Sequence, residues 1–241
     1  VFNMCKMKTH LFTVMTGAVK NIFGVIPGLI KTGYHAKLHD AARFAGMLLD
    51  LAQYVAPRLT IMDAVLAMEG DGPGSGDPRQ VGLLLGSENS LALDVVAGEI
   101  MGIDRTENPI IMEAERRALK PNRLEEIEIV GASLADVKVA DFKRSQVSAG
   151  SLGLQSMPWY QRILEPVFKN AFTVRPRVIW ERCIACGTCI EGCPVEAVSF
   201  ADEKAYIDDN KCIRCYCCHE LCPEEAIGLF SSWLYQLLKP A

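Results

Sequence analysis

Nine of the ten cysteines lie between Cys183 and Cys222, and eight of these nine form a repeat. Each copy has the pattern C-x2-C-x2-C-x3-C-P, and the second copy follows the first at an offset of 29 residues. The copies are Cys183, Cys186, Cys189 and Cys193, then Cys212, Cys215, Cys218 and Cys222. A disulfide framework suits small secreted domains, whereas this clustering beside a long cysteine-poor region suits metal ligation in a reducing compartment. We therefore expect a cytoplasmic metalloprotein.

The spacing favours two 4Fe-4S clusters. Three cysteines on a tight loop can hold three corners of a cluster, and the cysteine before proline reaches the other cluster. This assigns cluster I to Cys183, Cys186, Cys189 and Cys222, and cluster II to Cys212, Cys215, Cys218 and Cys193. Zinc is the alternative, because four thiolates also suit Zn²⁺. Zinc sites usually pair two short cysteine knuckles, whereas each half here has three evenly spaced cysteines and a Cys-Pro, so iron–sulfur is preferred.

The ninth cysteine of this segment, Cys217, does not fit the repeat. It aligns with Thr188, where the first copy has no thiol. We interpret it as a small buried residue beside a cluster. The alternative is a substitute ligand or a redox-sensitive thiol. No role is assigned to Cys5.

The segment from about Val178 to Phe230 resembles the bacterial ferredoxin with two 4Fe-4S clusters. The resemblance implies one-electron transfer and a redox partner protein. Clusters can also be purely structural, but two so close together suit an electron relay better.

The first 140 residues show alternating strand and helix patterns. We expect strands at residues 1–8, 58–68 and 81–86, helices at 36–56 and 87–102, and one more strand at 127–131. The sequence VGLLLG at 81–86 has the continuous apolar character of a strand buried on both faces. Such alternation predicts an α/β domain with a mainly parallel sheet, followed by a small α+β ferredoxin-type domain. The domain limits are 1–142 for the α/β domain, 143–177 for a linker and short helix, 178–230 for the ferredoxin-type domain and 231–241 for a C-terminal helix.

Basic residues near the start of the chain could bind an anion. Lys6, Lys8 and His10 would share one face at the C-terminal end of a strand, where open α/β sheets bind ligands. Lys20 and Asn21 follow in apolar surroundings. The predicted ligand-binding residues are therefore Lys8, His10, Lys20 and Asn21, and the ligand is a small anion. A solvated basic face explains the pattern equally well.

Four segments of the larger domain resemble the family called domain of unknown function 362. They are KMKTH, GAVKNIFG, AMEGDGPGSGDP and ALDVVAGEIMG, and a ferredoxin unit follows them as in many members. The match spans roughly residues 1–142 and covers the later part of that domain, so we expect truncation at the N-terminus. The third segment reads as a tight loop near the ligand, with Glu69 and Asp71 as polar contacts. The family name implies no substrate.

Charge and hydropathy limit the other partners. The formal net charge of −4 argues against nucleic acid. No apolar run approaches the roughly 20 residues that span a bilayer, so no membrane span is expected. Our interpretation is an iron–sulfur oxidoreductase or oxidoreductase subunit, which exchanges electrons with a site or partner on the α/β domain. The alternatives are a ferredoxin-like carrier without chemistry and an assembly or maturation factor, so the sequence leaves open whether the chain is an enzyme.

Overall fold

The computed structural model describes residues 1–28, 30–38, 40–74, 76–145 and 174–230. The chain forms two compact units. Unit 1 comprises Val1–Lys31 and Leu38–Ser145, and unit 2 comprises Thr32–Lys37 and Gln146–Ala241. The short helix predicted between 143 and 177 falls on residues 146–173, and the helix predicted at 231–241 follows residue 230. Both predictions lie outside the described residues.

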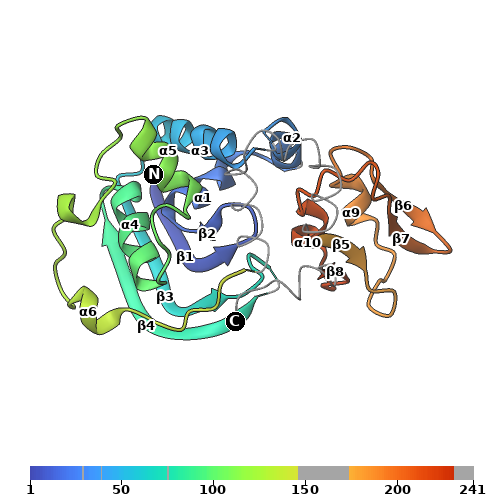
Figure 1. The fold of residues 1–241 in the computed structure, drawn as a ribbon. Coiled ribbons are helices and arrows are strands. Elements are labelled where there is room, and N and C mark those ends of the chain that lie inside the picture. The colour runs from blue at the N-terminus through green and yellow to red at the C-terminus, as the bar shows by residue number, and fades with distance from the viewer. Residues whose placement is uncertain (29, 39, 75, 146–173, 231–241) are drawn as a thin grey trace, which may run out of the picture. The chain divides into compact units, whose positions relative to one another are not determined.

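Unit 1 is built on a four-stranded sheet with the order β2-β1-β3-β4 (Figure 1). The strands are β1 (Phe2–His10), β2 (Val14–Thr16), β3 (Leu59–Glu69) and β4 (Asp77–Ser87). Only the β1–β3 pair is parallel, and the β1–β2 and β3–β4 pairs are antiparallel. The prediction of a mainly parallel sheet is therefore wrong. The short loop after Glu69 makes β3 and β4 a hairpin, because a parallel connection would need a crossover of a dozen or more residues.

The prediction that residues 81–86 are buried on both faces is also wrong. β4 is an edge strand, and its side chains alternate between partly buried and exposed positions. Val81, Leu83 and Leu85 pack against the core, whereas Leu84 is 71% exposed. Two of the intervening positions are glycines, Gly82 and Gly86. Burial therefore alternates along the strand with a period of two, although the sequence reads as continuously apolar.

Helices cover one face of the sheet (Figure 1). In chain order the helical elements of the first 145 residues are α1 (Ala18–Ile22), η1 (Phe23–Val25), α2 (Ile30–Lys37), α3 (Ala41–Val55), α4 (Ser90–Ile100), α5 (Pro109–Arg116), η2 (Leu124–Glu126) and α6 (Leu134–Val137). The helix expected at 36–56 is divided, because Asp40 caps α3 by accepting a 3.0 Å hydrogen bond from the backbone N–H of Arg43. Residues 127–131, where a strand was expected, follow η2. The structure describes them, and they form neither a strand nor a helix.

The core of unit 1 lies between the sheet and helices α1 and α4. Met7, Met62 and Ala97 are fully buried within it. A second buried group surrounds Phe44 of α3, whose ring packs edge-on against Phe12 and Phe23, with centroid distances of 5.2 and 5.4 Å. The amphipathic pattern that predicted α3 therefore corresponds to a real buried face.

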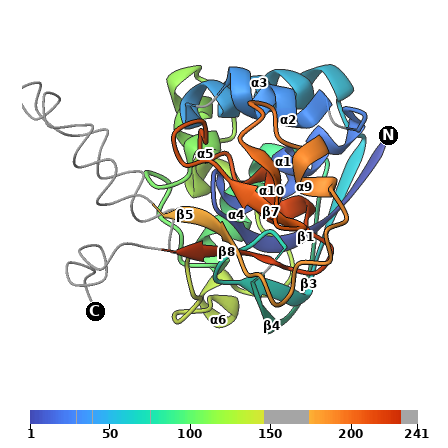
Figure 2. The same cartoon turned by 90° about the vertical axis from the view of Figure 1, so that its right-hand side faces the viewer.

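Unit 2 contains two small antiparallel sheets. β5 (Arg175–Val178) pairs with β8 (Ile227–Phe230) (Figure 2), and β6 (Val198–Ala201) pairs with β7 (Lys204–Ile207). Between residues 174 and 230 the structure also describes two short helices, α9 (Thr188–Glu191) and α10 (Cys217–Leu221). Among the described residues of the whole chain, no helix combines the length and the apolar character needed to cross a bilayer.

Candidate iron–sulfur centre

The cysteine repeat is also a repeat of backbone conformation. α9 begins at Thr188 and α10 begins 29 residues later, at Cys217. Left-handed φ angles recur at the same offset, in three pairs: Ala185 and Arg214, Gly187 and Tyr216, Glu196 and Glu225. Such conformations are uncommon for non-glycine residues. Their recurrence shows that the two loops wind their cysteines in the same way.

Backbone N–H groups point at the sulfurs of the two Cys-Pro cysteines. The N–H of Ala197 donates to Cys193 Sγ and the N–H of Ala226 donates to Cys222 Sγ, both at 3.2 Å. In the second loop the N–H of Arg214 also donates to Cys212 Sγ at 3.4 Å. Hydrogen bonds of this kind favour the thiolate, which is the form that binds metal.

The fourth cysteine of the second loop lies beside the first loop. Cys183, Cys186 and Cys189 of the first loop line one small cavity together with Cys222 of the second. The rest of the wall is mostly apolar and includes Val178, Ile184, Ala205 and Ile227. This is the group of four thiols that the spacing assigned to cluster I.

Cys193 lies near thiols of the second loop. Burial raises the pKa of the Cys212 thiol, and the nearby thiols of Cys215 and Cys193 raise it further. Burial also raises the pKa of Cys218, and the thiols of Cys215, Cys212, Cys189 and Cys193 add to this. Buried thiols that lie close together disfavour one another's ionisation. They therefore need a cationic partner to become thiolates.

The donor set fits an iron–sulfur cluster better than a single ion. In a structural zinc site four ligand atoms converge on one ion, with sulfurs about 2.3 Å from it. Among the described residues, no three Cys, His, Asp or Glu side chains converge in this way. Cys183, Cys186, Cys189 and Cys222 instead line one mostly apolar space, and four thiols around such a space suit a 4Fe-4S cluster. The second set, Cys212, Cys215, Cys218 and Cys193, stays a prediction from the spacing.

The position of Cys217 explains why this cysteine falls outside the pattern. The Cys217 thiol donates to the backbone carbonyl of Cys215 at 4.0 Å. In the first loop, the hydroxyl of Thr188 stands 3.4 Å from Cys186 Sγ and lowers the pKa of that thiol. Cys217 and Thr188 are related by the repeat offset, and each contacts the middle cysteine of its own loop. The sequence pairs the two positions but does not predict these contacts.

Lys8 and His10 of the predicted anion site lie at the end of β1. Lys8 Nζ donates to the carbonyl of Pro73 at 3.4 Å. His10 is buried, and its Nδ1 accepts from the backbone N–H groups of Phe12 and Thr13 at 2.9 and 3.3 Å. Lys6 pairs with Asp63 at 2.6 Å. These contacts give each side chain a role in holding its own unit together.

Lys20 and Asn21 make different contacts. Lys20 Nζ lies over the rings of Phe23 and Phe44, 5.2 and 5.9 Å from their centroids. Asn21 Nδ2 donates to Asn3 Oδ1 at 2.8 Å and to the carbonyl of Met4 at 3.1 Å. Asn21 therefore sits beside the start of β1, whereas Lys8 and His10 are at its end. The four-residue anion site stays a prediction.

The glycine-rich loop between β3 and β4 lies close to the end of β1, since a Cβ atom added at Gly72 would be 2.3 Å from the carbonyl oxygen of Thr9. Its two acids hold a neighbouring segment of unit 1. Glu69 is buried and accepts from the backbone N–H of Lys143 at 3.0 Å, and Asp71 accepts from the Ser145 hydroxyl at 3.2 Å.

Cys5 is also buried, and burial raises its pKa to about 12, so it remains a protonated thiol.

Comparison with known families agrees with the two units. Residues 182–226 match the family model described as 4Fe-4S dicluster domain, which supports 4Fe-4S binding and makes unit 2 a ferredoxin-type iron–sulfur module. Residues 1–99 match the model described as domain of unknown function (DUF362). Both resemblances predicted from the sequence are therefore confirmed over these residues.

A relative of part of the chain can be named. The chain is 43% identical over 126 residues to the thylakoid-associated protein sll1697 of Synechocystis sp.. The matched part is 52% of this chain and 39% of that protein. The chain thus spans well under half the length of this relative.

Proposed function

We propose that the chain is an electron-transfer protein with two 4Fe-4S clusters, and that it acts as an oxidoreductase or as a subunit of one. The observation that carries the proposal is that Cys222 of the second loop lines one cavity with the three cysteines of the first. Cys222 lies in one cavity with Cys183, Cys186 and Cys189, and Cys193 is an electrostatic neighbour of Cys212 and Cys218. A fourth ligand that comes from the other loop is the arrangement of two-cluster ferredoxins.

The clusters, when bound, supply one-electron transfer. The chain contributes the ligands, the backbone N–H groups of Ala197 and Ala226 that donate to sulfur, and an apolar wall that restricts water. Hydrogen bonds to sulfur and the exclusion of solvent are the protein's means of tuning reduction potential. Thr188 adds a side-chain contact to the sulfur of the middle cysteine of the first loop, and Cys217 contacts the backbone carbonyl of the middle cysteine of the second.

The electrons would pass to or from a site on the α/β unit or to a redox partner protein that docks there. Lys8, His10, Lys20 and Asn21 are the residues we propose for a small anionic ligand on this unit. A cytoplasmic location follows from the reduced thiols that cluster ligation requires. The relative's printed name associates it with thylakoids, so the electron partner could equally be held at a membrane surface.

Reversible reduction tests this proposal. Full-length protein purified without oxygen is reduced chemically and then reoxidised with a one-electron dye, while visible absorption is followed. We expect the broad absorption to fall and recover over repeated cycles, with about two electrons stored per chain. Loaded clusters that cannot be cycled would instead assign them a structural role, as in an assembly or maturation factor.

A further inference from the structure

Unit 1 contains a cavity of about 160 Å³ that neither the clusters nor the predicted anion residues explain. It lies among α4, the loop that follows it, α5 and the segment around η2. Its polar wall includes Arg105, Asn108, Asn122 and Arg123, and its apolar wall includes Val95, Ile103 and Ile111. An engineered cavity of about 150 Å³ binds benzene, a molecule of about six non-hydrogen atoms. The space therefore suits a small molecule.

The side chain of Asn122 provides an unused acceptor at this cavity. Asn122 is 3% exposed, its backbone N–H donates to Glu126 and its Nδ2 donates to the carbonyl of Leu119 at 2.7 Å. Its Oδ1 is buried and has no hydrogen-bond partner among the described residues. A buried polar atom without a partner costs about 1–3 kcal/mol, so such atoms are usually satisfied by something. The missing partner is a hydrogen-bond donor.

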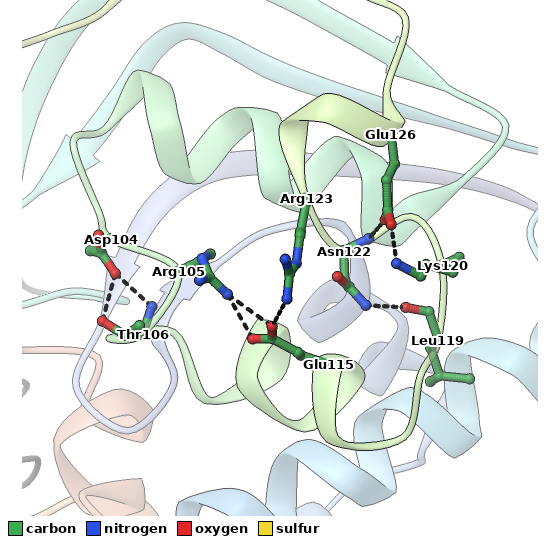
Figure 3. Close-up of polar contacts among 9 residues, drawn as sticks. All are labelled: Asp104, Arg105, Thr106, Glu115, Leu119, Lys120, Asn122, Arg123 and Glu126. Carbon is green, nitrogen blue, oxygen red and sulfur yellow. Dashed lines mark hydrogen bonds and ion pairs between the residues drawn. The ribbon is translucent and has the colours of Figure 1, made fainter.

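Two guanidinium groups stand beside Asn122. Arg105 and Arg123 both donate to Glu115 of α5, and they face one another across this carboxylate (Figure 3). Arg105 uses only Nη1 for this contact, at 2.8 and 3.0 Å, and Arg123 uses only Nη2. One carboxylate thus holds two cations, and the remaining N–H groups can bind a second carboxylate.

Three of the four acids that line the cavity have partners of their own, and the fourth, Glu125, is exposed. Asp94 is buried, and its two oxygens accept from the backbone N–H groups of Ala18 and Val19 at 2.5 and 3.0 Å. Asp104 accepts from the backbone and hydroxyl of Thr106, as Figure 3 shows. Glu99 pairs with Lys138 at 3.2 Å. These three acids are therefore engaged in the fold, and the acceptor of Asn122 and the donors of the two arginines remain for a ligand.

We infer that this cavity binds a small carboxylic acid with a hydrogen-bond donor on the neighbouring carbon. The carboxylate lies against Arg105 and Arg123, the donor satisfies Asn122 Oδ1, and a short aliphatic part contacts Val95, Ile103 and Ile111. The donor is either a hydroxyl, as in a 2-hydroxy acid, or an ammonium, as in an amino acid. The inference is independent of the proposed electron transfer, because all these residues belong to unit 1.

Three probes of nearly equal shape test the inference. Lactate, alanine and propionate carry a hydroxyl, an ammonium and no donor, respectively, on the carbon next to the carboxylate. Each is titrated into full-length protein in a calorimeter, and the melting temperature is measured in parallel. We expect lactate or alanine to bind and propionate to bind at least about tenfold more weakly, since it leaves Asn122 Oδ1 unsatisfied. Binding by lactate alone or alanine alone identifies the donor as hydroxyl or ammonium.

A matched pair of arginine variants completes the test. Arg123→Gln removes one cation from the cavity and should weaken the bound probe roughly ten- to a hundredfold. Arg116→Gln is the control, because Arg116 also pairs with a glutamate of α5 but lies outside the cavity wall. The inference is overturned if no probe binds at millimolar concentration, if propionate binds as well as the others, or if both variants behave alike. Reversible cluster reduction is measured separately and does not enter these outcomes.

Discussion

Replacing Cys193 with alanine should damage the cluster held by the second loop, although Cys193 belongs to the first loop in sequence. Cys193 is an electrostatic neighbour of Cys212 and Cys218, and the first loop's cavity is completed by Cys222 instead. A cluster that loses one of four thiolates becomes a three-iron cluster or is lost. We expect iron to fall from about eight per chain to between about four and seven, with a three-iron signal in EPR wherever the damaged cluster survives.

The matched control is Cys217→Ser. Cys217 is the counterpart of Thr188, and serine retains a hydroxyl that can donate to Cys215 as Thr188 does to Cys186. Iron and sulfide should therefore stay at the wild-type level. The opposite result, loss of a cluster in Cys217→Ser together with two intact clusters in Cys218→Ser, would shift the ligand assignment of the second loop by one residue.

Phe44→Ala should be the most destabilising single change in unit 1. Phe44 has no exposed surface, and its ring packs against Phe12 and Phe23 and lies under Lys20. Truncating a buried phenylalanine costs about 3–5 kcal/mol, through lost transfer free energy and the cavity left behind. Hydrogen exchange of the β1 and β3 amides reports the opening of this unit alone, and it should become at least roughly a hundredfold faster.

Tyr54→Ala is the control on the same helix. Tyr54 is 89% exposed near the end of α3, and such surface changes stay within about 0.5 kcal/mol. Equal exchange rates in the two variants would show that the aromatic group around Phe44 does not support the sheet. Iron content should be unchanged in both, since neither residue belongs to unit 2.

The parts of this protein that the sequence predicted well are those set by local spacing. Three cysteines spaced three residues apart predict a loop that holds them together. The offset of 29 residues between the two copies relates Cys193 to Cys222 without any knowledge of the fold. Helices α3 and α4 were likewise visible from their apolar stripes, which are local signals, although the cap at Asp40 that begins α3 was missed.

The errors concern relations between distant segments. An apolar run such as residues 81–86 indicates a strand but not its neighbours, so β4 was taken for a parallel, doubly buried strand when it is one arm of a hairpin. The Asn122 cavity had no sequence signal at all. Its wall comes from segments around Asp94, Arg105 and Arg123, and an unsatisfied oxygen is visible only in three dimensions.

The cluster content of the wild-type chain tests the central claim most directly. Full-length protein is purified without oxygen, and iron, acid-labile sulfide and zinc are measured on the same sample. Two complete sets of cysteines predict about eight iron and about eight sulfide per chain, with little zinc. Stoichiometric zinc with negligible sulfide would contradict the account, because it would make the paired loops structural zinc sites.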